Sequence, residues 1–460
     1  MKPRAKLDSK SKHREPQKHK VLNDSAKPVA VPKKVAPQTE RPRDEAAFAG
    51  DVKDPAMEGR ALKLLRSQDF LNQVVSATRR MGLVGEENNK LVVFLVGTSR
   101  VLDKPLCLFV KGPSSAGKNY LTDTVFSLFP ESEWRSLTSS SKRSWNYLGE
   151  QLENKIVYLK ERNADVGPVD PLRLLISEKQ LVHSVTVLQD GQFVEQKRIT
   201  KGPIAAISTT TRDKVEVDDE TRHLSIRVDE SPAQTTRIME AELEERRGLS
   251  AEELQAWHQV QHLLKSRAEL PIAFPDWFRT ISQSVPNDDV RVRRYFPAFL
   301  QACKTVALIR SFKRDEEQLR QQGRIMVKFT DFAIAALIFG PAFAQSLDKA
   351  SEQEFETQQN VQRISARNDG QPVSATDLAR ELNISGDRAY SLLRSAMDAG
   401  TISRANQPTR TNLKLYLPAT KGSFLPDPEI LFHKLKDASS ERVRFIHPIT
   451  GEWTEYRHKD

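Results

Sequence analysis

The sequence predicts an α/β core with a phosphate-binding loop, an inserted β-hairpin, a helical lid and a C-terminal winged helix-turn-helix. Three observations lead to this fold class. Short apolar runs alternate with amphipathic stretches over residues 59–230, and a glycine-bounded loop with a lysine follows one of these runs. From residue 231 onward, apolar residues recur at helical spacing. Alternating strands and helices favour a parallel sheet, whereas the later pattern favours packed helices.

Composition limits the class of protein. The 460 residues are 38% hydrophobic with a mean hydropathy of −0.55, which is enough for about two or three domains. No apolar run reaches about 18 residues, so we expect no transmembrane helix and no membrane partner. The N-terminus also lacks the apolar segment of a secretory signal. Cys107 and Cys303 lie in apolar stretches without neighbouring ligands, which predicts reduced core thiols, a cytoplasmic location and no zinc site.

The first 58 residues are predicted to be a disordered basic tail. Residues 1–50 contain 13 Lys and Arg against 6 Asp and Glu, and they supply most of the net charge of +10. They are also rich in Pro and Ala, with few aromatic residues. Such a tail suits non-specific contact with nucleic acid, and a solubilising role remains open.

The predicted core occupies residues 59–230. Its elements, in order, are helices at 61–82 and 86–100, a strand at 106–110, a helix at 120–129, a strand at 134–137, a helix at 144–152, a strand at 156–159 and a helix at 170–181. Asp190-Gly191 between two β-rich runs then predicts a hairpin over 182–200. Strands at 203–208 and 223–228 complete the core, so the hairpin precedes its fourth strand.

The candidate phosphate site follows the strand at 106–110. Its residues fit the P-loop pattern G-x-x-x-x-G-K-[ST] except at the last position: Gly112, Pro113, Ser114, Ser115, Ala116, Gly117, Lys118 and Asn119. Backbone N–H groups of such a loop and the next helix point at phosphate oxygens, and the lysine reaches the β- and γ-phosphates. Asn119 replaces the hydroxyl that normally holds Mg²⁺. The pattern predicts ATP binding, with an ordinary glycine turn as the alternative.

Glu161 follows the strand at 156–159, where a carboxylate that polarises the attacking water is expected. The preceding position, which usually carries a metal-supporting Asp, is Lys160. Binding of Mg²⁺ through Asn119 and Glu161 is one interpretation, and a solvated strand end is the other. Hydrolysis is therefore less secure than binding.

Two further groups are candidates for catalysis. Thr209, Thr210 and Thr211 follow the strand at 203–208, and Thr210 is our candidate for positioning water or sensing the γ-phosphate. Arg222 is a candidate arginine finger for a neighbouring subunit. An arginine from the cluster Arg291, Arg293 and Arg294 could also close on the nucleotide. The alternatives are strand-capping threonines and ordinary surface charge.

The C-terminal half is predicted to contain a helical lid at 231–345, a winged-helix unit at 346–420 and an extension at 421–460. The lid helices are expected at 232–247, 250–267, 274–284, 292–314 and 328–343. Ser374 and Asp377 approximate a capping box for the first helix of the small unit. Its second helix, 387–399, would enter a major groove. The residues expected to face DNA are Arg388, Ser391, Arg394, Arg404 and Arg410. A winged helix used for protein contacts is the alternative.

These motifs together resemble the AAA+ ATPases of the pre-sensor-1 β-hairpin group. This branch contains minichromosome-maintenance-like and superfamily 3 helicases, and the chain looks most like replication ATPases of bacterial mobile elements and phages. The matching segments are 112–118, 158–161, the hairpin at 182–200, 202–211 and 220–222, and the resemblance covers roughly 60–420. It departs from the family at Asn119 and Lys160.

The resemblance implies ATP and Mg²⁺ as cofactors and a homo-oligomeric ring, a hexamer, acting on DNA. In such families the hairpin contacts DNA in the channel, which carries over to Gln192, Lys197 and Arg198. A primase is a possible partner, although we find no primase segment in this chain.

The favoured reading is an ATP-driven helicase or helicase loader in replication of a mobile element. The alternative is a non-catalytic, nucleotide-switched DNA-binding initiator or regulator, which Asn119 and Lys160 favour. A small-molecule kinase is a weaker reading, because it gives the hairpin and winged helix no role.

Overall fold

The computed structural model describes the chain from residue 55 onward, with gaps. The described residues are 55–137, 152–161, 171–189, 192–212, 215, 217–244, 247–285, 290–347, 352–368, 371–398, 402–405, 414–418, 425–426, 428–435 and 442–457. The predicted tail up to residue 54, residues 144–151 of the predicted helix at 144–152, Asp190-Gly191 and Arg410 lie outside them. Among the described residues, no helix is long and apolar enough to cross a membrane.

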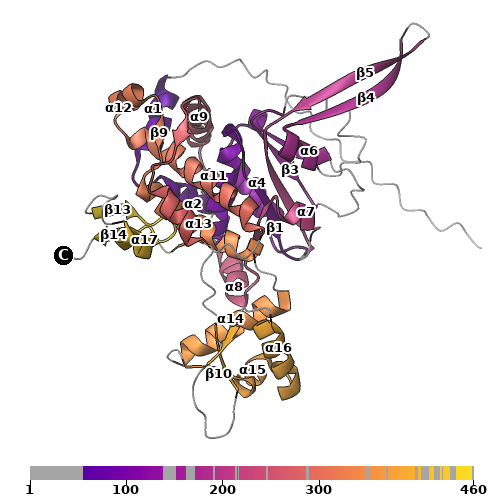
Figure 1. Ribbon diagram of the computed structural model, residues 1–460, viewed down its shortest axis with the longest axis vertical. Coiled ribbons are helices and arrows are strands. Elements are labelled where there is room, and N and C mark those ends of the chain that lie inside the picture. The colour runs from indigo at the N-terminus through magenta and orange to yellow at the C-terminus, as the bar shows by residue number, and fades with distance from the viewer. Residues whose placement is uncertain are drawn as a thin grey trace, which may run out of the picture. The chain divides into compact units, whose positions relative to one another are not determined.

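A five-stranded parallel sheet forms the centre of the core (Figure 1). Its strands, in the order β2-β3-β6-β1-β7, are β2 (Trp134–Leu137), β3 (Lys155–Leu159), β6 (Ile204–Thr210), β1 (Cys107–Lys111) and β7 (Leu224–Arg227). The registers are parallel throughout, with Lys111 opposite Thr210 on one side and Arg227 on the other. In open parallel sheets, ligands bind beyond the carboxyl ends of such central strands.

Both faces of the sheet are covered, as buried parallel strands require. Ile156 and Tyr158 of β3 join a hydrophobic cluster with residues of α3 (Glu87–Thr98) and α4 (Lys118–Phe126). Val157 and Leu159, which alternate with them, pack with residues of α6 (Pro171–Glu178). Cys107 and Cys303 are buried free thiols, as predicted.

An antiparallel pair of strands lies in the chain between α6 and β6. It consists of β4 (Gln180–Gln189) and β5 (Gln192–Lys201), with Gln180 opposite Lys201. In the part of the chain that the structure describes, the pair forms a sheet of its own, separate from the parallel sheet. The helix predicted to reach residue 181 ends instead at Glu178, because β4 begins two residues later.

The helix predicted over 61–82 is two helices, α1 (Pro55–Arg66) and α2 (Phe70–Arg80). Side-chain hydrogen bonds form the break between them. Ser67 Oγ donates to the Asp69 carboxylate, and Gln73 Nε2 donates to Asp69 Oδ1 at 2.7 Å and to Ser67 Oγ at 2.9 Å. Short polar side chains that bond locally compete with a continuous helix in this way.

Helices dominate the chain after β7. They are α8 (Pro232–Ala241), α9 (Ala251–Arg267), α10 (Phe278–Ser284), α11 (Val292–Arg310), α12 (Glu316–Gln322) and α13 (Phe329–Leu347). The short α7 (Val217–Glu220), α12 and the two-residue strands β8 (Ile272–Ala273) and β9 (Ile325–Met326) were not predicted. Trp257 of α9 packs 6.2 Å from Phe94 of α3, ring centroid to centroid. Residues 59–230 and 231–345 thus share one hydrophobic cluster.

A small unit with its own hydrophobic cluster follows α13. Its elements are α14 (Glu352–Arg367), β10 (Val373–Ser374), α15 (Ala375–Leu382), α16 (Gly386–Asp398), β11 (Ile402–Arg404) and β12 (Leu415–Pro418). The strands form an antiparallel sheet in the order β10-β12-β11. The predicted capping box is present, since Ser374 Oγ accepts from the Asp377 N–H at 3.2 Å and Asp377 accepts from the Ser374 N–H at 3.0 Å.

The last described segment packs on the main body of the chain. It contains α17 (Pro428–Lys434) and the antiparallel pair β13 (Arg442–Ile446) and β14 (Trp453–Arg457). The ring of Phe432 lies 5.3 Å from that of Phe329 in α13. Asn72 of α2 donates to the carbonyl of Pro448 at 3.0 Å.

Candidate nucleotide site

The candidate loop joins the carboxyl end of β1 to the first turn of α4. Its backbone takes left-handed or related conformations at Gly112 (φ 152°), Ser115 (φ 68°) and Gly117 (φ 84°), and Gly117 caps α4. These conformations turn the chain into the helix, whose first N–H groups have no partner within the helix. A helix N-terminus with such a loop is a site for phosphate.

Gly112 is required by close packing at the strand end. A Cβ at this position would lie 2.6 Å from Cγ2 of Val228 and 3.2 Å from Oε1 of Glu230. The loop therefore presses against the chain just beyond β7. Glu230 was not singled out from the sequence; the signal for it is that β7 pairs with β1, which brings residues after β7 to the edge where the loop lies.

Lys118 is held at the mouth of the loop. Its Nζ donates to the carbonyl oxygen of Gly112 at 2.7 Å and to that of Pro113. Partial burial lowers the pKa of Lys118, while the negative charges of Glu161 and Glu230 act in the opposite direction. The Lys118 ammonium is thus held by carbonyl oxygens of the loop itself.

Asn119 is engaged by two hydroxyl groups. Its Oδ1 accepts from Thr209 Oγ1 at 2.9 Å and from the Tyr158 hydroxyl at 3.3 Å. Tyr158 also shares a 2.5 Å hydrogen bond with Thr122 Oγ1 of α4, and burial raises the pKa of Tyr158. Tyr158 was not among the predicted site residues, because its place in the sequence is typical of a buried strand residue.

Glu161 lies two residues after the end of β3, in a left-handed conformation with φ 55°. Its backbone N–H donates to Thr209 Oγ1 at 3.0 Å, so the same threonine contacts Asn119 and fixes Glu161. The structure brings Thr209, rather than the predicted Thr210, to this site. Thr210 instead accepts from the Arg212 N–H at 3.1 Å.

Lys160 extends toward α4. Its Nζ lies 2.8 Å from Oδ2 of Asp123 and 5.4 Å from the ring centroid of Tyr158. Asp123 is one helical turn after Asn119, so this ion pair lies on the same side of α4 as the Asn119 contacts.

These contacts do not fit a protein-held Mg²⁺ at Asn119 and Glu161. Both acceptor positions of the Asn119 oxygen receive a hydroxyl, and the strand end presents an ammonium where a carboxylate normally supports the ion. Among the described residues, no group of three or more His, Cys, Asp or Glu could hold a metal. The donor set therefore suits phosphate better than a cation.

Arg222 lies at the other end of the sheet from the loop. It precedes the amino end of β7 by two residues, and its Nε donates to Ser177 Oγ at 3.2 Å. Arg294 donates to Thr221, and Arg291 donates to the Ser346 carbonyl at 3.4 Å. One length of β1, roughly 13 Å at the usual rise per residue, separates this end from the loop. Within one chain, Arg222 and Lys118 are thus not brought together.

The predicted DNA-facing residues lie on the antiparallel pair and on the small unit. Lys197 of β5 is exposed and Arg198 is half-buried. Arg388 and Arg394 on α16, and Arg404 on β11, are exposed. Lys414, which was not predicted, donates to the Tyr390 hydroxyl; this bond and the charges of Lys414, Arg394 and Arg404 lower the pKa of Tyr390. Four basic and aromatic side chains thus cluster on this unit.

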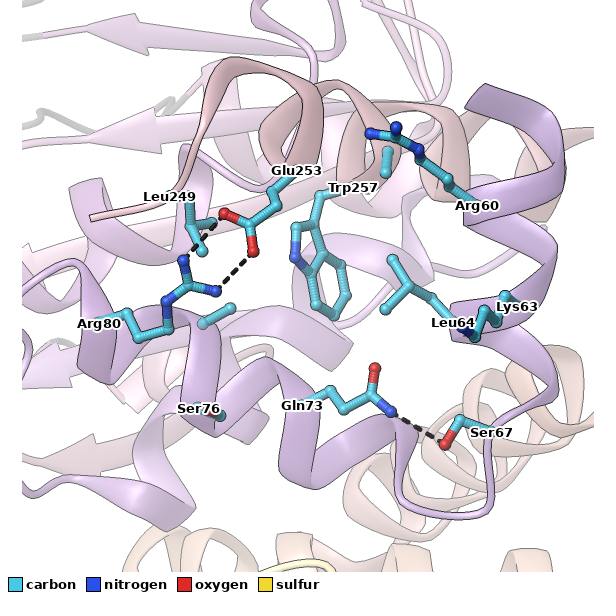
Figure 2. A pocket seen from close by; sticks show the side chains of 12 residues that line it. Arg60, Lys63, Leu64, Ser67, Gln73, Ser76, Arg80, Leu249, Glu253 and Trp257 are labelled. Atoms are coloured by element: carbon cyan, nitrogen blue, oxygen red, sulfur yellow. Dashed lines mark hydrogen bonds and ion pairs between the residues drawn. The ribbon is translucent and has the colours of Figure 1, made fainter. Parts of the chain in front are cut away.

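A separate cleft of about 430 Å³ lies between α1, α2 and α9 (Figure 2). Arg80 forms two hydrogen bonds with Glu253 across it, at 2.6 and 2.9 Å, and they lower the pKa of Glu253 to about 2. Figure 2 shows Trp257 beside this pair. None of the loop residues 112–119 lines the cleft.

No family model matches the chain, and no curated protein matches it in sequence. Solved structures do show similarity. A proposed ATPase from Cytophaga hutchinsonii is 11% identical with a TM-score of 0.36, over 61% of this chain and 88% of that one. A full-length MCM homologue from Methanopyrus kandleri is 13% identical with a TM-score of 0.37, over 64% and 62%. The apo C-terminal region of NrS-1 is 14% identical with a TM-score of 0.24, over 79% and 76%.

Proposed function

We propose that this chain binds a nucleoside triphosphate at the loop 112–118 and is an AAA+-like ATPase that acts on DNA. The observation that carries the proposal is the position of Lys118. Its ammonium lies at the loop mouth, at the N-terminus of α4 and near Glu161, at the carboxyl end of β1. Phosphate binding needs this combination of backbone donors and one mobile cation.

Hydrolysis is assigned to Glu161. In this step a water oxygen bonds to the γ-phosphorus, the bond to the bridging oxygen breaks, and the Glu161 carboxylate accepts the proton of the water. Lys118 stabilises charge on the β- and γ-oxygens. The backbone N–H of Glu161 donates to Thr209 Oγ1, so Thr209 is a positioning residue for Glu161.

We further propose that β4 and β5 are the DNA-contacting hairpin of a homo-oligomeric ring, that residues 231–345 act as a lid, and that 352–418 is a winged helix on DNA. Exposed Lys197 and the basic cluster around Tyr390 support the DNA contacts. A helicase or helicase loader in replication of a mobile element, with Arg222 acting on the neighbouring subunit, is the finer proposal. It is supported by the order of the motifs.

The second candidate function is a nucleotide-switched DNA-binding regulator that does not hydrolyse ATP. The ion pair of Lys160 with Asp123 favours it, because a positive charge replaces the usual metal-supporting carboxylate. ATP turnover with and without single-stranded DNA separates the two candidates: stimulated turnover supports the motor, and nucleotide binding without turnover supports the regulator.

The nucleotide site itself is tested with Lys118→Ala. Loss of a charge-assisted contact should weaken binding of a fluorescent ATP analogue by roughly 100-fold. Lys63→Ala, an exposed lysine on α1, is the matched control and should bind normally. Wild-type nucleotide affinity in Lys118→Ala would contradict the proposal.

The DNA contacts are tested with Lys197→Ala plus Arg198→Ala. The pair should leave DNA affinity nearly unchanged but remove DNA stimulation of ATP turnover. Deleting residues 1–50 should instead weaken DNA binding and flatten its salt dependence, by about 0.7–0.9 in slope for each lost phosphate contact. Normal stimulation in the double variant would leave β4 and β5 as a structural insertion.

A further inference from the structure

A second pocket lies at the amino ends of β1 and β7, away from the loop. We call it the amino-end pocket; it encloses about 300 Å³. Four cationic side chains line it: Lys104, Arg222, Arg293 and Arg294. Apolar side chains, among them Leu106 and Pro297, form the rest, and no Asp or Glu is among its described lining residues. This chemistry suits a segment that carries carboxylates and apolar side chains together.

The chain itself carries such a segment, residues 238–244, which we call the α8 ridge. Ile238, Met239 and Leu243 are 44%, 66% and 89% exposed. Glu240, Glu242 and Glu244 alternate with them and are exposed as well. Gln234 is the buried residue of α8, so the end of the helix presents its apolar side chains to solvent. Exposed apolar patches with a polar rim are typical of interaction surfaces.

The ridge and the pocket lie at opposite ends of the same strands. The pocket includes Cys107 and Leu224, the first residues of β1 and β7. The ridge consists of the end of α8 and the three residues after it, and α8 begins shortly after the carboxyl end of β7, where Val228 lies close to the loop at Gly112. Two complementary surfaces on opposite ends of one molecule join copies head to tail, and repeated contacts of this kind give a ring or a filament.

We propose that the α8 ridge of one copy docks in the amino-end pocket of the next copy. The carboxylates of the ridge pair with the arginines of the pocket, and the apolar side chains of the ridge leave solvent. This contact brings Arg222 of one copy to the loop end of its neighbour, so it specifies how the proposed ring is joined. It rests on the proposed assembly and does not require nucleotide binding.

Charge reversal tests the proposal. A pocket variant carries Arg293→Glu and Arg294→Glu, and a ridge variant carries Glu240→Lys, Glu242→Lys and Glu244→Lys. Self-association of full-length protein is measured by sedimentation velocity and light scattering. Wild type should assemble, and each variant alone should associate at least roughly 30-fold more weakly. An equimolar mixture should assemble again, because the native ridge matches the native pocket and the reversed ridge matches the reversed pocket, so the two variants can alternate.

The decisive arm is the chain that carries both sets of reversals, which should assemble again. Arg320→Glu with Arg324→Glu, two exposed arginines elsewhere, is the matched control and should assemble like wild type. A monomeric wild type, or variants that assemble normally, would overturn the proposal, as would a monomeric mixture of correctly folded variants. Nucleotide binding is measured on the same samples and tests the loop separately. If the wild type does not bind nucleotide, the proposed nucleotide site is contradicted, whereas the result on docking still holds.

Discussion

The candidate site has two sides. The phosphate side, residues 112–118, is formed mainly by backbone, whereas the cation side, formed by Asn119, Lys160 and their partners, depends on side chains. Residues 112–118 achieve their shape through glycine conformations and the start of α4. On the cation side, Asn119 is tied to Tyr158 and Thr209, and Lys160 is tied to Asp123. Because the two sides use different groups, we expect phosphate binding and metal binding to be separable: substitutions at Asn119 and Lys160 should change metal binding and leave phosphate binding intact.

Among these variants, Glu161→Gln should have the largest effect, and the effect should be on ATP turnover. The amide cannot accept the proton of the attacking water, so ATP turnover should fall by roughly 10²–10⁴-fold. Nucleotide affinity should not change, because the loop remains. Turnover is measured by phosphate release under saturating ATP. Unchanged turnover would remove Glu161 from the mechanism, whereas nucleotide binding without turnover in the wild type would favour the regulator.

Gly112→Ala should distort the backbone of the phosphate side and weaken nucleotide binding. The new Cβ would meet Val228 at 2.6 Å, at a φ of 152°. Strain of about 1–3 kcal/mol at such a position should displace the loop and weaken nucleotide binding by up to roughly 100-fold. The measurement is titration with a fluorescent ATP analogue, with Gly340→Ala, which has no nearby atoms, as the matched control. Equal affinities in the two variants would show that the loop backbone does not set binding.

Asn119→Thr combined with Lys160→Asp should give the cation side ligands for Mg²⁺. Wild-type nucleotide affinity should be nearly the same with Mg²⁺ or with a chelator. The double variant supplies a hydroxyl and a carboxylate, the oxygen ligands that Mg²⁺ prefers, so its affinity should gain roughly tenfold on adding Mg²⁺. Lys160→Met alone serves as the control for lost charge. If nucleotide binding by the wild type strictly required Mg²⁺, phosphate binding and metal binding would not be separable.

Most of the core could be predicted from apolar periodicity, because buried parallel strands and long helices leave strong patterns. The position of Thr209 could not. The strand predicted to end at 208 continues to Thr210, and alternation along it decides which hydroxyl faces Asn119. The break at 67–69 depends on hydrogen bonds between short polar side chains. The contacts of Tyr158 and Lys160 with α4 depend on how β3 packs against that helix, which spacing along one segment does not encode.

The connections of the small unit 352–418 have a mechanical consequence. The chain enters it from α13 and, after leaving it, packs on α13 again through α17 and β13. The unit is thus tethered at both ends rather than hanging as a tail. Helix α13 is also hydrogen-bonded to the parallel sheet, because Ser346 Oγ of α13 accepts from the Ser225 N–H of β7 at 2.8 Å. A force on this unit would therefore act on β7, the edge strand that pairs with β1.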